Sequence, residues 1–270
     1  MKPARFDYAV PTTLDEAVAL LNATPNAKVV AGAQTLGPML NLRLVQPALL
    51  VDITRIPELI AVEDDGDWIS YGACVTHAAI EDGRVPDRTA GVLPQVAHGI
   101  AYRAVRTRGT IGGSLAHADP AADWLSALTA LGAMVTAYDG KTERSIRVSE
   151  LMTGVFETAI RADEILTTVR VPGLSGDARF GYHKICRKTG EFAEAIGAVL
   201  RDPARGIFRG VAGATEAAPI LFDDLTAMTN GAGLDPEAVR TGLQDGGLTD
   251  AYELQLHAVA LERAAAEALS

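Results

Sequence analysis

The segment that most constrains the fold is glycine-rich and reads RTRGTIGGSLAHADPAADW, at residues 106–124. It places three glycines between residues 109 and 113. Glycine adopts backbone angles that other residues avoid, so successive N–H groups can converge on one anion, usually a phosphate. Thr110 and Ser114 add hydroxyl donors. These residues leave two interpretations open, an anion-binding loop and a tight structural turn.

A second glycine-containing loop, AGAQTLG at residues 31–37, directly follows a predicted strand. Gln34 and Thr35 supply further donors there. Two donor-rich loops, each beside a predicted strand, could hold the two phosphates of one dinucleotide. Neither loop fits a common nucleotide signature. The chain has no GxxxxGK followed by Ser or Thr, and no GxGxxG after its first strand, so a P-loop is excluded and a standard Rossmann site is unsupported.

Hydrophobic periodicity and turn signals predict alternating strands and helices in the first 172 residues, and an antiparallel pattern after them. A capping-box pattern at residues 13–16 opens the first helix. Further strands are expected at residues 6–10, 28–31, 49–52, 66–73, 134–138 and 164–172, and further helices at 75–83, 91–100 and 122–133. Three strand-like runs at 179–188, 195–202 and 206–215 precede two helices, the second with the apolar stripe Leu254, Ala258, Leu261, Ala265 and Leu269.

The pattern changes near residue 173, which predicts a domain boundary there. A glycine-rich α/β arrangement precedes this point, and an antiparallel sheet with helices follows it. The fold class is therefore expected to be α+β.

Charge and cysteine content exclude several classes of protein. The formal net charge is −10, which disfavours wide contact with nucleic acid because phosphate binding needs a basic face. Two distant cysteines, Cys74 and Cys186, argue against a disulfide scaffold and are too few for a four-cysteine iron–sulfur cluster. No apolar run is long enough for a membrane span, and the N-terminal residues lack the apolar core of a signal peptide, so we expect a cytoplasmic protein.

Five stretches of the chain resemble a known family. They are MKPARFDY with VVAGAQTLGPMLNLRL, then IAYRAVRTRGTIGGSLAHADPAAD, then GYHKICRKTGEFA, and finally GVAGATEAAPI. Together they resemble the FAD-binding medium subunit of the molybdenum hydroxylases, the carbon monoxide dehydrogenase and xanthine dehydrogenase family. The stretches run through both glycine loops and cover nearly the whole chain.

The resemblance implies an FAD-binding module of the vanillyl-alcohol-oxidase (PCMH-like) type at residues 1–173, with subdomains at about 1–56 and 57–173. An α+β domain with an antiparallel sheet and helices would follow at 174–270. Noncovalent FAD would lie between the subdomains, with its pyrophosphate against both glycine loops. Asp123 would bond the flavin nucleotide, and Lys184 would lie near the flavin ring. The implied cofactor-binding residues are Ala31, Gly32, Ala33, Gln34, Thr35, Leu36, Thr110, Ile111, Gly112, Gly113, Ser114, His117, Asp119, Asp123 and Lys184.

The resemblance also implies partners. Hydroxylation would occur at a molybdopterin cofactor in a large subunit, and a small subunit with 2Fe–2S clusters would pass electrons to the FAD. The expected assembly is (αβγ)2, with an external electron acceptor. No residue of this chain is expected to be catalytic in the strict sense, because its residues would hold and tune the flavin. The alternatives are a stand-alone FAD-dependent reductase or oxidase and a flavin-free assembly subunit.

One position departs from the family pattern, and several residues have simpler structural roles open to them. Ala33 stands where the family has glycine. If the backbone there is left-handed, alanine costs about 1–2 kcal/mol, and FAD would be lost more easily than usual. His117 has a helix-cap or packing role as its alternative, and Asp119 reads as an N-cap followed by proline. We expect no metal site.

Two arginines beside the glycine segment keep three interpretations. Arg106 and Arg108 could neutralise a phosphate, lie on the surface, or contact the small subunit.

Overall fold

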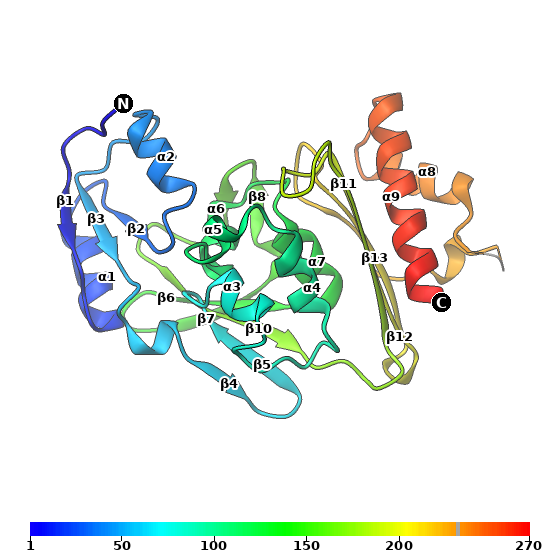
Figure 1. Ribbon diagram of the computed structural model, residues 1–270, viewed down its shortest axis with the longest axis horizontal. Coiled ribbons are helices and arrows are strands. Elements are labelled where there is room, and N and C mark those ends of the chain that lie inside the picture. The colour runs from blue at the N-terminus through cyan, green and yellow to red at the C-terminus, as the bar shows by residue number, and fades with distance from the viewer. Residues whose placement is uncertain (231–232) are drawn as a thin grey trace.

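The computed structural model describes residues 1–230 and 233–270, which build three larger sheets and one two-stranded hairpin, with helices around them (Figure 1). The first sheet is parallel, with the strand order β1-β3-β2. Its elements are β1 (Asp7–Ala9), α1 (Leu14–Ala23), β2 (Lys28–Val30), α2 (Leu36–Asn41) and β3 (Leu49–Asp52). The predicted capping box forms at the start of α1. Thr13 Oγ1 accepts from Glu16 N at 3.2 Å, and Glu16 Oε2 accepts from Thr12 N at 3.0 Å.

The second sheet is antiparallel and lies in the middle of the molecule, with the strand order β4-β5-β10-β6-β7 (Figure 1). Its strands are β4 (Val62–Asp64), β5 (Trp68–Gly72), β6 (Met134–Tyr138), β7 (Glu143–Arg147) and β10 (Ile165–Pro172). The associated elements are η1 (Pro57–Leu59), α3 (His77–Glu81), α4 (Val92–Gly99), α5 (Arg103–Arg106), α6 (Ile111–His117), α7 (Asp123–Leu131), η2 (Val148–Glu150) and the hairpin β8 (Met152–Gly154) with β9 (Glu157–Thr158).

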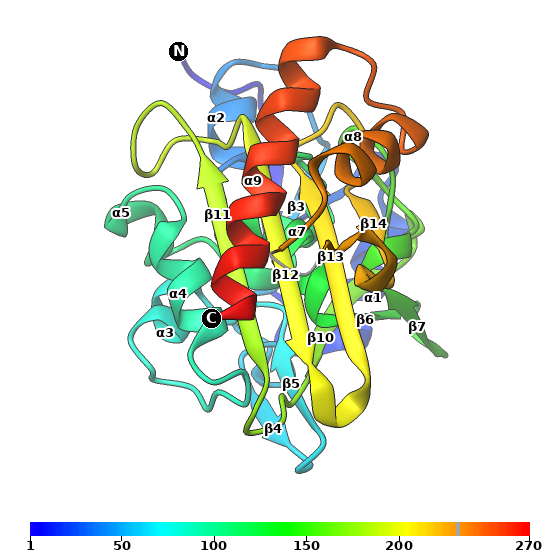
Figure 2. The same cartoon turned by 90° about the vertical axis from the view of Figure 1, so that its right-hand side faces the viewer.

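The third sheet is antiparallel and follows the chain order β11-β12-β13-β14. Its elements are β11 (Arg179–Ile185), β12 (Ala195–Asp202), η3 (Pro203–Arg205), β13 (Ile207–Gly213), β14 (Ile220–Phe222), η4 (Thr226–Met228), α8 (Pro236–Asp245) and α9 (Ala251–Leu269). Helix α9 crosses one face of this sheet (Figure 2), while α7 contacts the same strands β12 and β13. The sheet therefore joins the middle of the molecule to the C-terminal helices.

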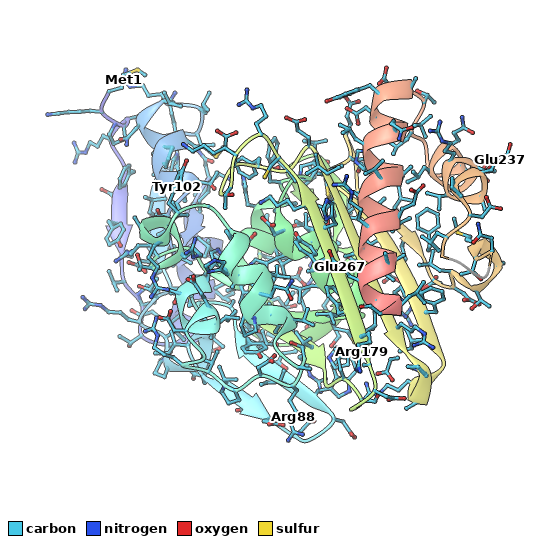
Figure 3. All side chains as sticks on the ribbon, turned by 45° about the vertical axis from the view of Figure 1, so that its right-hand side comes forward. Met1, Arg88, Tyr102, Arg179, Glu237 and Glu267 are labelled. Atoms are coloured by element: carbon cyan, nitrogen blue, oxygen red, sulfur yellow. The ribbon has the colours of Figure 1, made fainter. Side chains whose placement is uncertain are left out.

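Close backbone approach fixes α9 on this sheet. A methyl group on Gly181 or Gly197 would overlap the carbonyl oxygen of Ala264 or Ala260 respectively, so only glycine allows the helix to come this near. Glu267 of α9 lies beside β11 (Figure 3), and its Oε2 accepts from the backbone N–H of Tyr182 at 3.0 Å.

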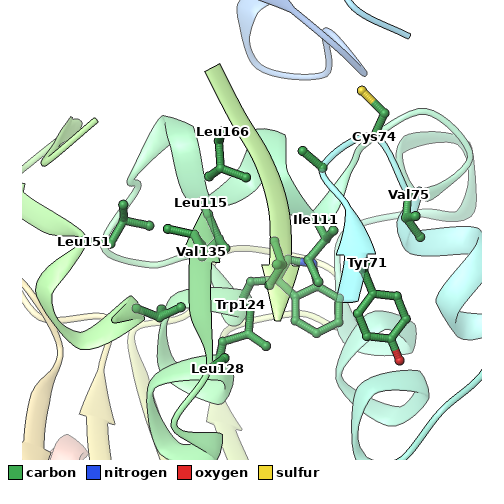
Figure 4. Packing of buried hydrophobic residues seen from close by; sticks show 14 of the residues in the cluster. Tyr71, Cys74, Val75, Ile111, Leu115, Trp124, Leu128, Val135, Leu151 and Leu166 are labelled. Carbon is green, nitrogen blue, oxygen red and sulfur yellow. The ribbon is translucent and has the colours of Figure 1, made fainter. Parts of the chain in front are cut away.

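The main core lies around α7, in which every residue is buried. Trp124 is fully enclosed among apolar side chains that include Ile111, Leu128 and Val135 (Figure 4). Its indole Nε1 donates to His77 Nδ1 at 3.0 Å, so the one polar atom of this side chain has a partner inside the core. This core ties α7 to α6 and to the second sheet.

Most elements lie where the sequence predicts them, but the secondary structure of the segment 106–124 differs from the prediction. We expected a loop there, and the structure has helix α6 at Ile111–His117 with Thr110 as its N-cap. The N-cap of α7 is Ala122, so the expectation of Asp119 at that position is wrong. The C-terminal stripe packs as predicted except at Leu269, which is 40% exposed.

Within the described part of the chain, no helix combines the length and apolar character needed to cross a membrane.

Candidate functional site

A cavity of about 630 Å³ brings together segments that are far apart in the sequence. Its walls come from β2 and the loop 31–36, from α6 with the residues before it, from the hairpin β8–β9, and from the loop after β11. Fourteen of the fifteen predicted cofactor-binding residues line it: Ala31, Gly32, Ala33, Gln34, Thr35, Leu36, Thr110, Gly112, Gly113, Ser114, His117, Asp119, Asp123 and Lys184. The remaining one, Ile111, is fully buried in the core instead.

The loop 31–36 presents unused donors to the cavity. The backbone N–H groups of Ala33, Gln34 and Thr35 have no acceptor within residues 1–230 and 233–270. The Gln34 side chain folds back, and its Nε2 donates to Gly32 O at 2.9 Å. Ala33 has φ +58°, which is the left-handed conformation. This conformation is more costly for alanine than for the glycine that the family has at this position. This loop therefore has free, successive N–H donors of the kind that an anion needs.

The second glycine segment uses its donors differently from the prediction. Ile111 N and Gly112 N donate to Val75 O and Ala73 O, each at 3.0 Å. Gly113 N donates to the Thr110 hydroxyl at 3.1 Å, and Ser114 N donates to Thr110 O at 3.0 Å. The expectation that these N–H groups converge on a ligand is wrong, because the first turn of α6 is held by its own cap and by the segment at 73–75.

Steric packing explains the glycines in and beside this segment. A methyl on Gly112 would come within 2.5 Å of Ala73 Cβ, and none of glycines 109, 112 and 113 has a positive φ. A methyl on Gly32 would overlap the carbonyl oxygen of Arg108. The two glycine segments therefore touch, backbone against backbone, and this contact places the free donors of the loop 31–36 beside α6.

A buried ion pair forms a further part of the wall. Lys184 Nζ contacts Asp123 Oδ2 at 3.0 Å, and Tyr182 Oη donates to Asp123 Oδ1 at 2.8 Å. The Lys184 and Asp123 side chains are only 12% and 7% exposed. Burial raises the pKa of the Asp123 carboxyl, and the Lys184 ammonium opposes part of that rise. Asp123 thus holds the Lys184 ammonium at the cavity.

His117 and Asp119 combine cavity and structural roles. His117 ends α6 and stacks against Phe156 with ring centroids 5.0 Å apart, and burial lowers its pKa. Asp119 Oδ1 accepts from Ala121 N at 3.0 Å and fixes the turn before α7. No group of three or more His, Cys, Asp or Glu side chains suited to a metal ion occurs in the described residues.

The two arginines beside the glycine segment have distinct roles. Arg106 is buried, contacts Glu81 through Nε at 2.7 Å and through a terminal nitrogen at 2.9 Å, and donates to the carbonyls of Ile100 and Ala101. The Arg106 guanidinium lowers the pKa of Glu81 to about 2. Arg106 is therefore engaged inside the protein and does not line the cavity, whereas Arg108 is exposed.

Several residues on the cavity wall lay outside the sequence prediction. Lys28 belongs to β2, the strand that leads into the first glycine loop, and this position in the sequence could have predicted its place at the cavity. His77, Phe156 and Phe192 reach the wall from separate elements. No local motif marks these three, because only the tertiary fold brings them to the site.

Comparison with known proteins gives a family and several relatives. Residues 4–174 match the family described as FAD binding domain in molybdopterin dehydrogenase. The nicotine 6-hydroxylase medium subunit of Paenarthrobacter nicotinovorans is 32% identical over 95% of this chain and 91% of its own length. The carbon monoxide dehydrogenase medium chain of Afipia carboxidovorans is 29% identical over 98% of this chain and 96% of its own length.

The fold also matches a solved structure. A chain in the structure of carbon monoxide dehydrogenase from Hydrogenophaga pseudoflava superposes with a TM-score of 0.90 at 29% identity, covering 100% of this chain and 99% of that chain. The agreement over the whole length confirms the expected α+β fold class.

Proposed function

The chain belongs to the family of FAD binding domains in molybdopterin dehydrogenases, and from this premise we propose that it is the FAD-carrying medium subunit of a multi-subunit molybdenum hydroxylase. Family membership confirms the resemblance that the glycine-rich motifs indicate. Relatives named as a medium subunit and a medium chain match over almost their full lengths, which favours a subunit over a stand-alone flavin enzyme.

The cavity fits FAD in size and in the chemistry of its donors. Its volume of about 630 Å³ lies within the range of roughly 300–1,000 Å³ that is common for cofactor sites. The free N–H groups at residues 33–35 suit a pyrophosphate. Thr35 is the N-cap residue of α2, but its hydroxyl makes no capping hydrogen bond. These unused donors are the observation that carries the proposal. Bound FAD would supply the redox chemistry, taking up electrons and releasing them singly or in pairs.

The residues of this chain would bind, orient and tune the cofactor. The loop 31–36 would hold the pyrophosphate, and α6 would form the adjoining wall of the site. The Lys184 ammonium, fixed by Asp123, would stabilise negative charge on the flavin ring. The proposed cofactor-binding set is the predicted one, Ala31, Gly32, Ala33, Gln34, Thr35, Leu36, Thr110, Ile111, Gly112, Gly113, Ser114, His117, Asp119, Asp123 and Lys184. Ile111 belongs to it only through its place in α6.

The boundary at about residue 173 is part of the same proposal. The second sheet ends with Pro172 and the third begins at Arg179, which supports an FAD module at 1–173 and a separate domain at 174–270. The first and second sheets likewise support subdomains at about 1–56 and 57–173.

Partner subunits would carry the remaining cofactors. The chain has two cysteines, one buried and one half-buried, which are too few for the ligands of a four-cysteine cluster. The proposal therefore includes a small subunit with 2Fe–2S clusters and a large molybdopterin subunit. The (αβγ)2 stoichiometry and the cytoplasmic location remain predictions.

Co-expression with the neighbouring genes, followed by purification through a tag on this chain, tests the proposal. We expect FAD, iron and molybdenum in one complex with a small and a very large chain. A yellow chain that purifies alone and reduces dyes with a soluble donor would instead establish the stand-alone reductase. A complex that contains iron and molybdenum but no flavin would establish the assembly subunit.

A further inference from the structure

A buried histidine outside the recognised motifs lies at the cavity wall. His77 begins α3 and is only 5% exposed, yet it lines the cavity. Its backbone N–H donates to Gly109 O at 2.9 Å, which ties it to the glycine segment. A methyl on Gly109 would lie 2.9 Å from the imidazole Nε2. Only glycine at residue 109 therefore lets the backbone pack this close to the edge of the ring.

A neighbouring indole fixes the position of the imidazole proton. Trp124 Nε1 donates to His77 Nδ1 at 3.0 Å, and an indole N–H can only donate. Nδ1 must therefore carry the lone pair, and the proton of the neutral ring lies on Nε2. Burial lowers the pKa of His77 to about 4, with a smaller contribution from the Arg106 guanidinium, so the ring is neutral at physiological pH.

The protonated nitrogen is a donor without a partner. Within residues 1–230 and 233–270, His77 Nε2 makes no hydrogen bond. It is not one of the fully enclosed polar atoms that lack partners, which belong to Ser126, Thr129, Arg209 and His257. Nε2 is therefore not fully enclosed, and His77 lies on the cavity wall. A buried donor of fixed direction at a ligand cavity is typical of a binding residue.

We propose that His77 is a further cofactor-binding residue, which donates an uncharged hydrogen bond through Nε2–H to an oxygen of the FAD pyrophosphate. The pyrophosphate end is indicated because His77 lies close to the loop 31–36, whose free N–H groups suit a pyrophosphate: Gly109 packs against the imidazole, and a methyl on Gly32 would lie 2.8 Å from Gly109 Cα. Trp124 is a positioning residue, because it selects the tautomer and does not line the cavity. This inference rests on the proposed binding of FAD.

A pair of variants isolates the Nε2–H donor. Trp124→Phe removes the indole partner, and His77→Phe in that background then removes the imidazole without leaving a buried indole N–H unpaired. Flavin fluorescence titration of the 270-residue chain gives the dissociation constant of FAD for each. We expect the double variant to bind FAD about 10- to 100-fold more weakly than Trp124→Phe, the range for one hydrogen bond to a charged acceptor. Affinities within about twofold would overturn the inference.

Controls separate this result from other failures. His257→Phe removes a buried imidazole that lies outside the cavity, and it should leave FAD affinity unchanged. ADP, which shares the adenosine and the diphosphate of FAD but lacks the flavin, should lose affinity in the double variant by the same factor. An effect on FAD without one on ADP would contradict the pyrophosphate assignment. A wild-type chain that binds no FAD would defeat the proposed function itself.

A measurement on the wild-type chain needs no substitution. Nitrogen-15 NMR of histidine-labelled protein distinguishes a protonated from an unprotonated ring nitrogen. We expect a protonated Nε2 and an unprotonated Nδ1 for His77 at neutral pH. A proton on Nδ1 would contradict the donor geometry.

Discussion

Replacement of Ala33 by glycine should strengthen FAD binding. Ala33 has φ +58°, where the Cβ atom of an L-residue costs about 1–2 kcal/mol and glycine has no such cost. The N–H groups of residues 33–35 have no acceptor in the protein, so a bound anion would hold this loop conformation. Because no other group of the protein holds these N–H groups, we expect the free loop to leave this conformation in solution and the backbone strain of Ala33 to return when FAD binds.

The magnitude follows from two opposing terms. Glycine removes the strain of about 1–2 kcal/mol, but a more flexible residue costs about 0.4–1 kcal/mol more to order. The midpoints of these two ranges leave a net gain of about 0.8 kcal/mol, which corresponds to roughly a fourfold lower dissociation constant. The stability of the free chain should change less, because the half-buried Ala33 methyl also packs against Val30, Leu40 and Leu50.

Titration of the flavin-free chain with FAD, followed by the change in flavin fluorescence, measures this effect. Ala90→Gly is the matched control, because Ala90 also has a left-handed φ of +54° but lies outside the cavity. It should leave FAD affinity unchanged. Equal or weaker binding by Ala33→Gly, or an equal gain in Ala90→Gly, would refute the reasoning.

Three further predictions concern the same site. Gly32→Ala should weaken FAD binding at least tenfold, because the added methyl would overlap the Arg108 carbonyl. In the control Gly37→Ala the methyl meets no atom within 4 Å, so this variant should bind FAD normally. Equal dissociation constants of FAD for the two variants would contradict the packing argument. Lys184→Met should lower the free energy of unfolding at pH 7 by about 3 kcal/mol, because the Asp123 carboxylate stays buried without its partner. Urea denaturation should show a smaller loss at lower pH, where the Asp123 carboxyl is protonated. The pKa of His77 is about 4 in the folded chain, against an ordinary value of 6.5. The contribution of the neutral imidazole to stability is therefore complete above pH 6.5 and is lost as the pH falls towards 4. Urea midpoints of the Trp124→Phe, His77→Phe double variant should lack this part of the pH dependence.

Local sequence signals were sufficient for the regular elements. The strands at Leu49–Asp52, Met134–Tyr138 and Ala195–Asp202 have the predicted bounds, because apolar runs between turn residues leave little choice of register. Helix α6 was hidden because Gly112 and Gly113 have poor helix propensity. Its stability comes from the Thr110 cap and from the carbonyls of Val75 and Ala73, which accept from Ile111 and Gly112 and lie 36 and 39 residues earlier in the chain, so no local pattern contains these contacts.

The difference between local sequence signals and tertiary contacts also applies to the site. Almost all of the residues that the motifs identified meet at the cavity, but the motifs did not show which donors are free there. That depends on tertiary contacts, such as the hydrogen bonds of α6 to Ala73 and Val75, and the Asp123–Lys184 pair across 61 positions. His77 was missed for the same reason, since its significance arises from Trp124 and Gly109.

The FAD content of the isolated chain tests the central claim most directly. The chain, purified with excess FAD and freed of unbound cofactor, should show flavin absorption in the visible range that corresponds to one FAD per chain. The Gly32→Ala variant treated in parallel should retain much less. A folded wild-type chain that is colourless and takes up no FAD on titration would contradict the account.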